Sequence, residues 1–316
     1  MPKTDKDMAS GGAIVLALHA GTPHIGEQID SFLAQTVRDW ILVVSNDGPD
    51  DGALAKIESA RQGFQNGLIV TSRKSYGFAD NFLSALADVP EEVEWVALSD
   101  QDDVWLPQKL SRAVEALRRT PHDQPALYAA SRLLWDPRTN KTWPTQISTS
   151  RGPSFANALV ENVAPGNTIV FNRAALNILK PLAKDARRVF AHDWWIYQIL
   201  TGVGSAVTID AEPVVLYRQH GGNLIGETQS IVALIRRKWR ALMGDFSRNM
   251  SLQLAALEPA RHILTPENQR ILEAFVSARA QKNPLLRLYR LMKSGAHRQS
   301  AAAHLSLLIA ALLGKI

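Results

Sequence analysis

Residues 93–110 read VEWVALSDQDDVWLPQKL, and this stretch decides the fold. Its first seven residues form a short apolar run that is typical of a buried strand. Asp100, Asp102 and Asp103 follow at once, and Trp105 opens a segment with helical spacing. Clustered carboxylates repel one another and raise each other's pKa. Two interpretations follow: an acidic turn that caps the next helix, or a cation held by Asp100 and Asp102, which an extended segment places on one side.

A cation at this position would be a hard one. Carboxylates are oxygen ligands, which suit Mg²⁺ or Mn²⁺, and these ions keep waters and share phosphate oxygens with a substrate. The chain has no cysteine, so thiolate metal sites and disulfides are excluded, and a reducing compartment is the simpler expectation.

Apolar runs and helix-like stretches alternate through the first half of the chain. Helices between continuously apolar strands indicate right-handed crossovers and an α/β fold with a mostly parallel central sheet covered by helices. The expected strands are 13–19, 40–45, 67–72 and 93–99, and the expected helices are 26–36, 52–64 and 77–88.

Polar residues follow each of these strands. In parallel sheets, ligands bind outside the carboxyl ends of the strands, so these positions form the candidate site. They are His19, Asn46, Asp47, Arg73 and the acidic run from Asp100, with Gln101 inside it.

The rest of the chain suggests an extension of the sheet and then a helical region. Strands are expected at 126–135, 167–173 and 206–218, with helices at 174–183 and 192–201. Beyond 228 the pattern is helical, and Pro259, Pro266 and Pro284 should divide it. We therefore expect a catalytic domain over 1–227, with a nucleotide-binding half at about 13–110 and an acceptor-side half at about 120–227, and a basic amphipathic helical region over 228–316.

Charge is distributed unevenly between these two regions. Residues 228–316 hold 14 Lys+Arg and 4 Asp+Glu, a net charge of +10, whereas residues 1–227 have a net charge of −5. The run at 1–21 resembles a signal peptide, but Asp5 and Asp7 and the short AIVLAL segment favour a first strand. No window reaches the about 20 apolar residues of a spanning helix.

Several motifs occur in the order found in family 2 glycosyltransferases, and the chain resembles that family over about 13–226. The run ALSDQDDVWLPQKL (97–110) is similar to its D-x-D metal-binding segment. The other matching segments are 27–54, 76–82, PGNTIVFNR (165–173), HDWW (192–195) and YRQHGGN (217–223). Several motifs in the family's order are specific evidence for the family, whereas any one of them alone would be weak evidence.

The resemblance implies a GT-A fold and a role for each matching residue. Asp47 would bind the pyrimidine base of a nucleotide-sugar donor, with His19, Asn46, Arg73 and Gln101 near the donor. Asp100 and Asp102 would meet the metal and the ribose–diphosphate, and His220 would be a further metal or diphosphate contact. Asp193 would be the catalytic base, and Gly166, Asn167, Trp194 and Trp195 would lie on the acceptor side.

Alternatives remain for two of these motifs. Residues alone favour Asp193 as a helix N-cap beside two core tryptophans. For His220 the alternative is a hydrogen-bonded surface histidine, but the neighbouring Tyr217, Arg218 and Gly221-Gly222 favour a loop that faces a ligand. The chain also departs from the family, which commonly has Tyr-Asn at His19-Ala20, Asp at Asn46 and Asn at Ser75.

These roles predict a metal-dependent, inverting glycosyltransferase. The metal would stabilise the departing diphosphate, and a carboxylate would take the proton of the acceptor hydroxyl. The motif forms resemble rhamnosyltransferases of surface polysaccharide (O-antigen) synthesis, so dTDP-L-rhamnose is the first expected donor. Alternative donors are UDP- or dTDP-hexoses, and the transferred group could instead be a sugar phosphate. A further alternative is a protein of this fold that binds a nucleotide or glycan but catalyses no reaction.

The basic C-terminal region has two interpretations. Its helices either pack on the catalytic domain or lie on the inner leaflet of a membrane, where anionic lipids attract cations. The second fits a cytoplasmic enzyme with peripheral membrane contact and a glycan or lipid-linked glycan acceptor. Nucleic acid is not expected as a partner, because no reader motif accompanies the charge.

Overall fold

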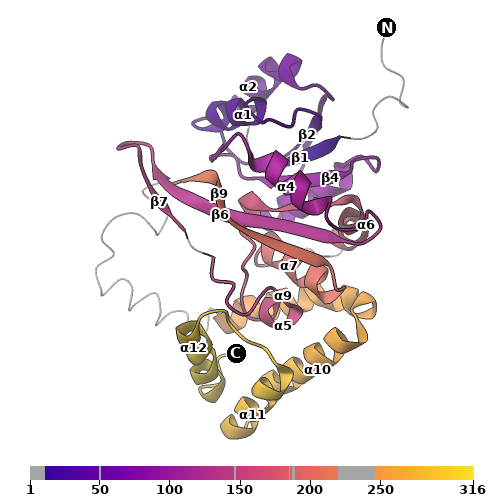
Figure 1. The fold of residues 1–316 in the computed structure, drawn as a ribbon, viewed down its shortest axis with the longest axis vertical. Coiled ribbons are helices and arrows are strands. Elements are labelled where there is room, and N and C mark those ends of the chain that lie inside the picture. The colour runs from indigo at the N-terminus through magenta and orange to yellow at the C-terminus, as the bar shows by residue number, and fades with distance from the viewer. Residues whose placement is uncertain (1–10, 50, 146, 185, 187–188, 220–245) are drawn as a thin grey trace. The chain divides into compact units, whose positions relative to one another are not determined.

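The computed structural model describes residues 11–49, 51–145, 147–184, 186, 189–219 and 246–316 (Figure 1). The chain divides into two compact units. The first comprises 1–147, 164–188 and 205–219, and the second comprises 148–163, 189–204 and 220–316. The expected boundary at 227 lies outside the described residues, so the division into 1–227 and 228–316 stays a prediction.

The described part of the first unit is built on one nine-stranded sheet, whose first four strands are parallel as predicted. They are β1 (Gly12–Leu18), β2 (Trp40–Asn46), β3 (Leu68–Ser72) and β4 (Trp95–Ser99), in the order β3-β2-β1-β4. The crossovers contain α1 (Ile25–Leu33), α2 (Ala53–Ser59) and α3 (Phe78–Ala85). The 3₁₀ segments Arg61–Gly63 and Leu86–Asp88 end the second and third crossovers.

The sheet continues beyond β4 with mixed directions. The order is β8-β6-β9-β5, and β7 pairs with the outer part of β6. β8 (Val170–Asn172) runs antiparallel between β4 and β6 (Ala126–Asp136), so β6 points the same way as β4. β6 pairs in parallel with β9 (Ala206–Arg218), and both are long strands in Figure 1. The sequence did not predict β5 (Val104–Trp105) or β7 (Lys141–Pro144).

Aromatic side chains fill the core on one side of the sheet. The ring of Phe32 meets that of Trp105 edge-on, with centroids 4.6 Å apart, and meets that of Trp40 at 6.3 Å. Gly12 is part of the same packing, because a Cβ there would overlap the Trp95 ring. α4 (Lys109–Leu117) buries residues at helical spacing, as the sequence predicted, and α6 (Arg173–Ala183) follows β8.

The described part of the second unit is helical. It contains α5 (Phe155–Ala158), α7 (His192–Gly202), α9 (Phe246–Leu257), a 3₁₀ segment (Glu258–Ile263), α10 (Pro266–Ala280), α11 (Pro284–Ser294) and α12 (Ala301–Leu312). Pro266 and Pro284 each lie in the first turn of a helix, where no N–H is needed, and the side chains of Thr265 and Asn283 cap those helices. The predicted breaks at the prolines are therefore confirmed. In the described parts of the chain, no helix is both long and apolar enough to cross a bilayer.

Candidate functional site

The loops after β1 and β2 meet at a carboxylate. Nδ1 of His19 lies 2.9 Å from Oδ1 of Asp47, and the hydroxyl of Ser75 donates to Oδ2 of the same carboxylate. The side chain of Asp47 is 8% exposed and that of His19 is 68% exposed. Asp47 is therefore oriented by two partners, both at positions where the chain departs from the family pattern.

Gln101 joins the loop after β4 to the loop after β1. Its side-chain amide donates to the carbonyl of His19 at 2.9 Å and accepts from the backbone N–H of His19 at 2.7 Å. The structure thus brings together His19, Asp47, Ser75 and Gln101 at one edge of the sheet, as expected for the carboxyl ends of parallel strands.

Two of the predicted donor residues have structural partners. Oδ1 of Asn46 accepts from the N–H of Gly48 at 3.1 Å, which forms the turn after β2. A Cβ at Gly48 would lie 2.7 Å from the backbone N of Ala20, so the two loops touch through their backbones. The guanidinium of Arg73 pairs with Asp88 and donates to the carbonyl of Ser84 at 3.0 Å, which ties it to α3 and its 3₁₀ extension. Contacts of Asn46 and Arg73 with a donor stay predictions.

The acidic run divides into exposed and buried carboxylates. Asp100 and Asp102 are partly exposed, whereas Asp103 is fully buried. Asp103 accepts hydrogen bonds from Nδ2 of Asn167 at 2.5 Å and from the N–H of Arg218 at 3.2 Å. Burial, and then the charge of Asp102, raise the pKa of Asp103 to about 6. No local sequence pattern marks Asp103 as a buried structural residue.

A buried lysine lies beneath this run. Nζ of Lys109 donates to the carbonyl of Asn167 at 2.6 Å and is 3.1 Å from the ring centroid of Trp105. Burial lowers the pKa of Lys109 well below its usual value, and the carboxylates of Asp103 and Asp100 oppose that shift. Its only sequence signal was its place in the W-x-P-x-K-L run, which assigned it no role.

Two arginines reach the acidic segment from the far half of the sheet. Nε of Arg218 donates to the carbonyl of Asp102 at 2.7 Å, and its guanidinium pairs with Glu27. Nη1 of Arg132 donates to Oδ1 of Asn167 at 3.2 Å, and the guanidinium lies 4.3 Å from the ring centroid of Tyr217. Asn167, predicted on the acceptor side, is therefore a buried junction between β6, α4 and the acidic run.

The exposed carboxylates fit a divalent ion that shares its ligands with a substrate. Among the described residues, no group of three His, Asp or Glu side chains could hold a metal. Asp100 and Asp102 supply two oxygen-donor side chains, and Mg²⁺ or Mn²⁺ commonly completes its shell with phosphate oxygens and water. After burial, the charge of Asp102 is the second cause of the raised pKa of Asp103, so the carboxylates of this run interact with one another. His220 lies outside the described residues.

Comparison with known proteins identifies the family. The model of the family described as Glycosyl transferase family 2 matches residues 14–177, just over half of the chain. The chain belongs to glycosyltransferase family 2. The predicted family and the predicted enzyme class, a glycosyltransferase, are both confirmed.

Similar proteins agree with this assignment. The dTDP-rhamnosyl transferase RfbG of Shigella flexneri is 25% identical over 237 residues, covering 71% of this chain and 80% of the relative. S. aureus TarS 1–349 in complex with UDP-GlcNAc has a TM-score of 0.52 at 13% identity, covering 96% of this chain and 90% of that one. GalNAc-T7 with UDP, GalNAc and Mn²⁺ has a TM-score of 0.51 at 9% identity, covering 91% and 55%. The predicted GT-A fold is confirmed.

The residue that the family 2 resemblance makes the catalytic base lies in the second unit. Asp193 is partly exposed in the first turn of α7, and its Oδ1 accepts from the N–H of Trp194 at 2.7 Å. The N-cap is Ala191, so Asp193 is not the cap itself. The indole N–H groups of Trp194 and Trp195 donate to the carbonyls of Ala158 at 2.6 Å and Ala256 at 3.0 Å.

Both tryptophans are buried, which is the core placement that the residues alone favoured. Gly166 begins the 3₁₀ segment Gly166–Thr168 in front of β8, next to the buried Asn167. The catalytic role of Asp193 and the acceptor-side roles of Gly166, Asn167, Trp194 and Trp195 stay predictions.

Proposed function

We propose that this glycosyltransferase moves a sugar from a pyrimidine nucleotide donor to a glycan or lipid-linked glycan with inversion, and that dTDP-L-rhamnose is the first donor to test. The observation that carries the proposal is the convergence of Asp47 with the loop of Asp100 and Asp102 through His19 and Gln101. The similarity to the dTDP-rhamnosyl transferase RfbG over 71% of the chain supports the rhamnosyl donor. Surface polysaccharide synthesis by a cytoplasmic enzyme stays a prediction from the motif resemblance. TarS with UDP-GlcNAc supports a nucleotide-sugar donor.

Each half of the donor has a matching group. The carboxylate of Asp47, held by His19 and Ser75, is an acceptor for the imide N–H of a uracil or thymine base. Asp100 and Asp102, with His220 as the family pattern suggests, would hold Mg²⁺ or Mn²⁺ against the diphosphate. When bound, the metal supplies Lewis-acid stabilisation of the leaving group. GalNAc-T7 with UDP and Mn²⁺ supports a metal of this kind.

Asp193 provides the base in this proposal. Its carboxylate takes the proton of the acceptor hydroxyl while the oxygen attacks the anomeric carbon, opposite the departing diphosphate. One displacement of this kind inverts the configuration. Asp193 lies in the first turn of α7, so the helix fixes the position of its backbone.

The test is a thermal-shift screen of sugar nucleotides in Mn²⁺ and in EDTA, followed by assay of dTDP release and of the product's anomeric configuration. A ligand at a hundred times its Kd stabilises the folded state by about 2.7 kcal/mol. We expect dTDP-rhamnose to raise the Tm only with the metal, and Asp102→Asn to abolish that part of the shift. Asp123→Asn, at an exposed loop carboxylate, is the control. Equal shifts in EDTA, or a shift retained by Asp102→Asn, would contradict the metal site, and binding without sugar release would indicate a non-catalytic protein.

A further inference from the structure

Exposed apolar side chains gather on the last two helices. Fifteen large hydrophobic side chains are exposed among the described residues, and eight of them lie on α11, α12 and the residue that follows α12. Leu285 is 73% exposed, Met292 63% and Leu305 58%. Side chains of this size are normally exposed singly, so their concentration in one place needs an explanation.

On each helix these side chains form one face. Leu285, Tyr289 and Met292 are spaced by four and three residues on α11, while Leu291 on the other side is fully buried. On α12 the exposed set is Leu305, Ile309, Leu312 and Leu313, and the buried set includes Leu307 and Ala311. Each helix therefore packs through one face and presents a second apolar face to solvent.

The two helices are joined before any partner arrives. Nη1 of Arg287 on α11 donates to the carbonyl of Ala311 on α12 at 2.8 Å, and Nη1 of Arg290 donates to Oγ of Ser277 on α10 at 2.8 Å. These bonds fix α11 to both neighbouring helices. A binding partner would therefore meet a formed surface, and little ordering entropy would be lost on contact.

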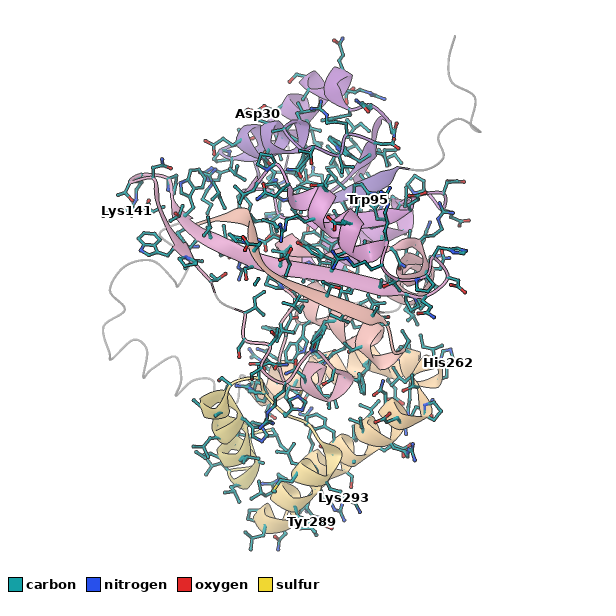
Figure 2. All side chains as sticks on the ribbon, in the orientation of Figure 1. Asp30, Trp95, Lys141, His262, Tyr289 and Lys293 are labelled. Atoms are coloured by element: carbon teal, nitrogen blue, oxygen red, sulfur yellow. The ribbon has the colours of Figure 1, made fainter. Side chains whose placement is uncertain are left out.

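The charge of this region has one sign. Residues 274–316 contain seven Lys and Arg and no Asp or Glu. Lys282 and Lys293 are exposed, and Figure 2 shows Tyr289 and Lys293 near one another on the outer side of α11. A second copy of the chain would bring like charges together at such a contact, which is unfavourable. The complementary partner is apolar and anionic.

We infer that the exposed face of α11 and α12 docks on the surface of a bilayer that contains anionic phospholipid. Its leucines, Tyr289 and Met292 would enter the boundary between headgroups and acyl chains, while Lys282 and Lys293 meet lipid phosphates. This inference goes beyond the proposed reaction, because it concerns no residue of the donor site and holds whichever sugar is transferred. It also selects α11 and α12 from the whole basic region, of which 234–242 lies outside the described residues.

The experiment uses full-length protein and sedimentation with sucrose-loaded vesicles. One set is phosphatidylcholine alone, and the other contains about one-third phosphatidylglycerol. The apolar variant combines Tyr289→Ser, Met292→Ser and Leu305→Ser, and the charge variant combines Lys282→Gln and Lys293→Gln. The control combines Lys141→Gln and Trp143→Ser, an exposed cation and an exposed aromatic residue on β7. Circular dichroism melting checks that all variants fold.

We expect binding to the anionic vesicles, weakened by salt, and little binding to phosphatidylcholine alone. Each removed lysine should weaken partitioning roughly fivefold. The apolar variant should bind the anionic vesicles at least about tenfold more weakly than the wild type, and the control should bind like the wild type. The inference is overturned if the wild type ignores anionic vesicles, if the folded helix variants bind as well as the control, or if the variants instead abolish self-association measured without lipid.

Discussion

Nζ of Lys109 lies 2.6 Å from the carbonyl oxygen of Asn167, and neither residue is more than 1% exposed. The bond joins the start of α4, the first helix after the acidic run, to the 3₁₀ segment in front of β8. The same asparagine donates to Asp103 through its side chain. The loop with the proposed metal carboxylates and the predicted acceptor-side loop therefore share one buried polar junction.

Lys109→Met should destabilise the protein by about 3 kcal/mol. Methionine keeps the unbranched stem beside Trp105 but removes the donor to Asn167 and an ammonium group that interacts with the charge of Asp103. Urea unfolding measures the change. Lys180→Met is the matched control, because Lys180 also donates to a backbone carbonyl, Val89 at 2.8 Å, but is partly exposed. The Lys180→Met substitution should lower the free energy of unfolding by less than about 1 kcal/mol. Equal losses for the two lysines would show that burial of Lys109 adds nothing.

Asp103 should make the metal-free protein less stable as pH rises. Its pKa is raised from 3.8 to about 6 in the folded state, so the folded state binds this proton more tightly than the unfolded state does. The resulting stability is complete below about pH 4 and is lost as pH rises through about 6, a change of about 3 kcal/mol. Urea unfolding in EDTA across this range, compared with Asp103→Asn, measures it. If the difference between the two proteins does not change with pH, Asp103 does not titrate in this range.

His19 and Ser75 should act together on nucleotide binding. Each contacts a different oxygen of Asp47, so His19→Ala and Ser75→Ala should each weaken binding about three- to tenfold. Calorimetric titration of the single and double variants gives the coupling energy, which we expect to differ from zero by at least about 0.5 kcal/mol. Ser59→Ala, which removes an exposed hydroxyl of α2, is the control and should bind normally. Strictly additive effects would mean that Asp47 is not a shared target.

Asp193→Asn should reduce kcat about 10²- to 10⁴-fold and leave the Kd of the donor nucleotide unchanged. The amide cannot accept the acceptor's proton, but the donor contacts remain. Steady-state kinetics with calorimetry separates the two quantities. Asp30→Asn, at an exposed carboxylate of α1, should retain full activity. If donor affinity falls as much as kcat does, Asp193 contributes to donor binding and is not the catalytic base.

Gly12→Ala and Gly26→Ala should change stability in opposite directions. A methyl group at Gly12 would overlap the Trp95 ring, so the substitution should cost about 3 kcal/mol or more. At Gly26, in the first turn of α1, no atom lies within 4 Å of the new Cβ. Alanine there should add about 0.5 to 1 kcal/mol by reducing the entropy of the unfolded chain. Denaturant midpoints of the two proteins test both signs.

The parallel half of the sheet was predictable because local sequence determines it. β1, β2 and β4 are short apolar runs that are buried almost throughout, and the observed strand ends lie within two residues of the predicted ones. β7 gave no such signal, since all four of its residues are exposed, and β5 has only two residues. β5 pairs with β9, far along the chain, whereas β7 forms a hairpin with β6, the strand just before it.

The site residues that directly follow a strand could be predicted from the sequence. Those that depend on contacts between residues far apart in the chain could not. Asp47 and Asp100 were identified from their positions. The network of Asp103, Lys109 and Arg132 depends on contacts with Asn167 that span 64, 58 and 35 residues. No local pattern encodes such pairs. Because Asp, Lys and Arg are rarely fully buried, their sequence alone predicts a surface position for them.

The close approach at Gly48 has a consequence for redesign of donor choice. Because a methyl group there would collide with the backbone at His19 and Ala20, residue 48 fixes how the loops after β1 and β2 meet. Residues 19 and 75 contact Asp47 through their side chains, so exchanging them leaves the backbone contact at Gly48 in place. Libraries that aim at a new nucleobase should therefore randomise 19 and 75 and leave 48 untouched.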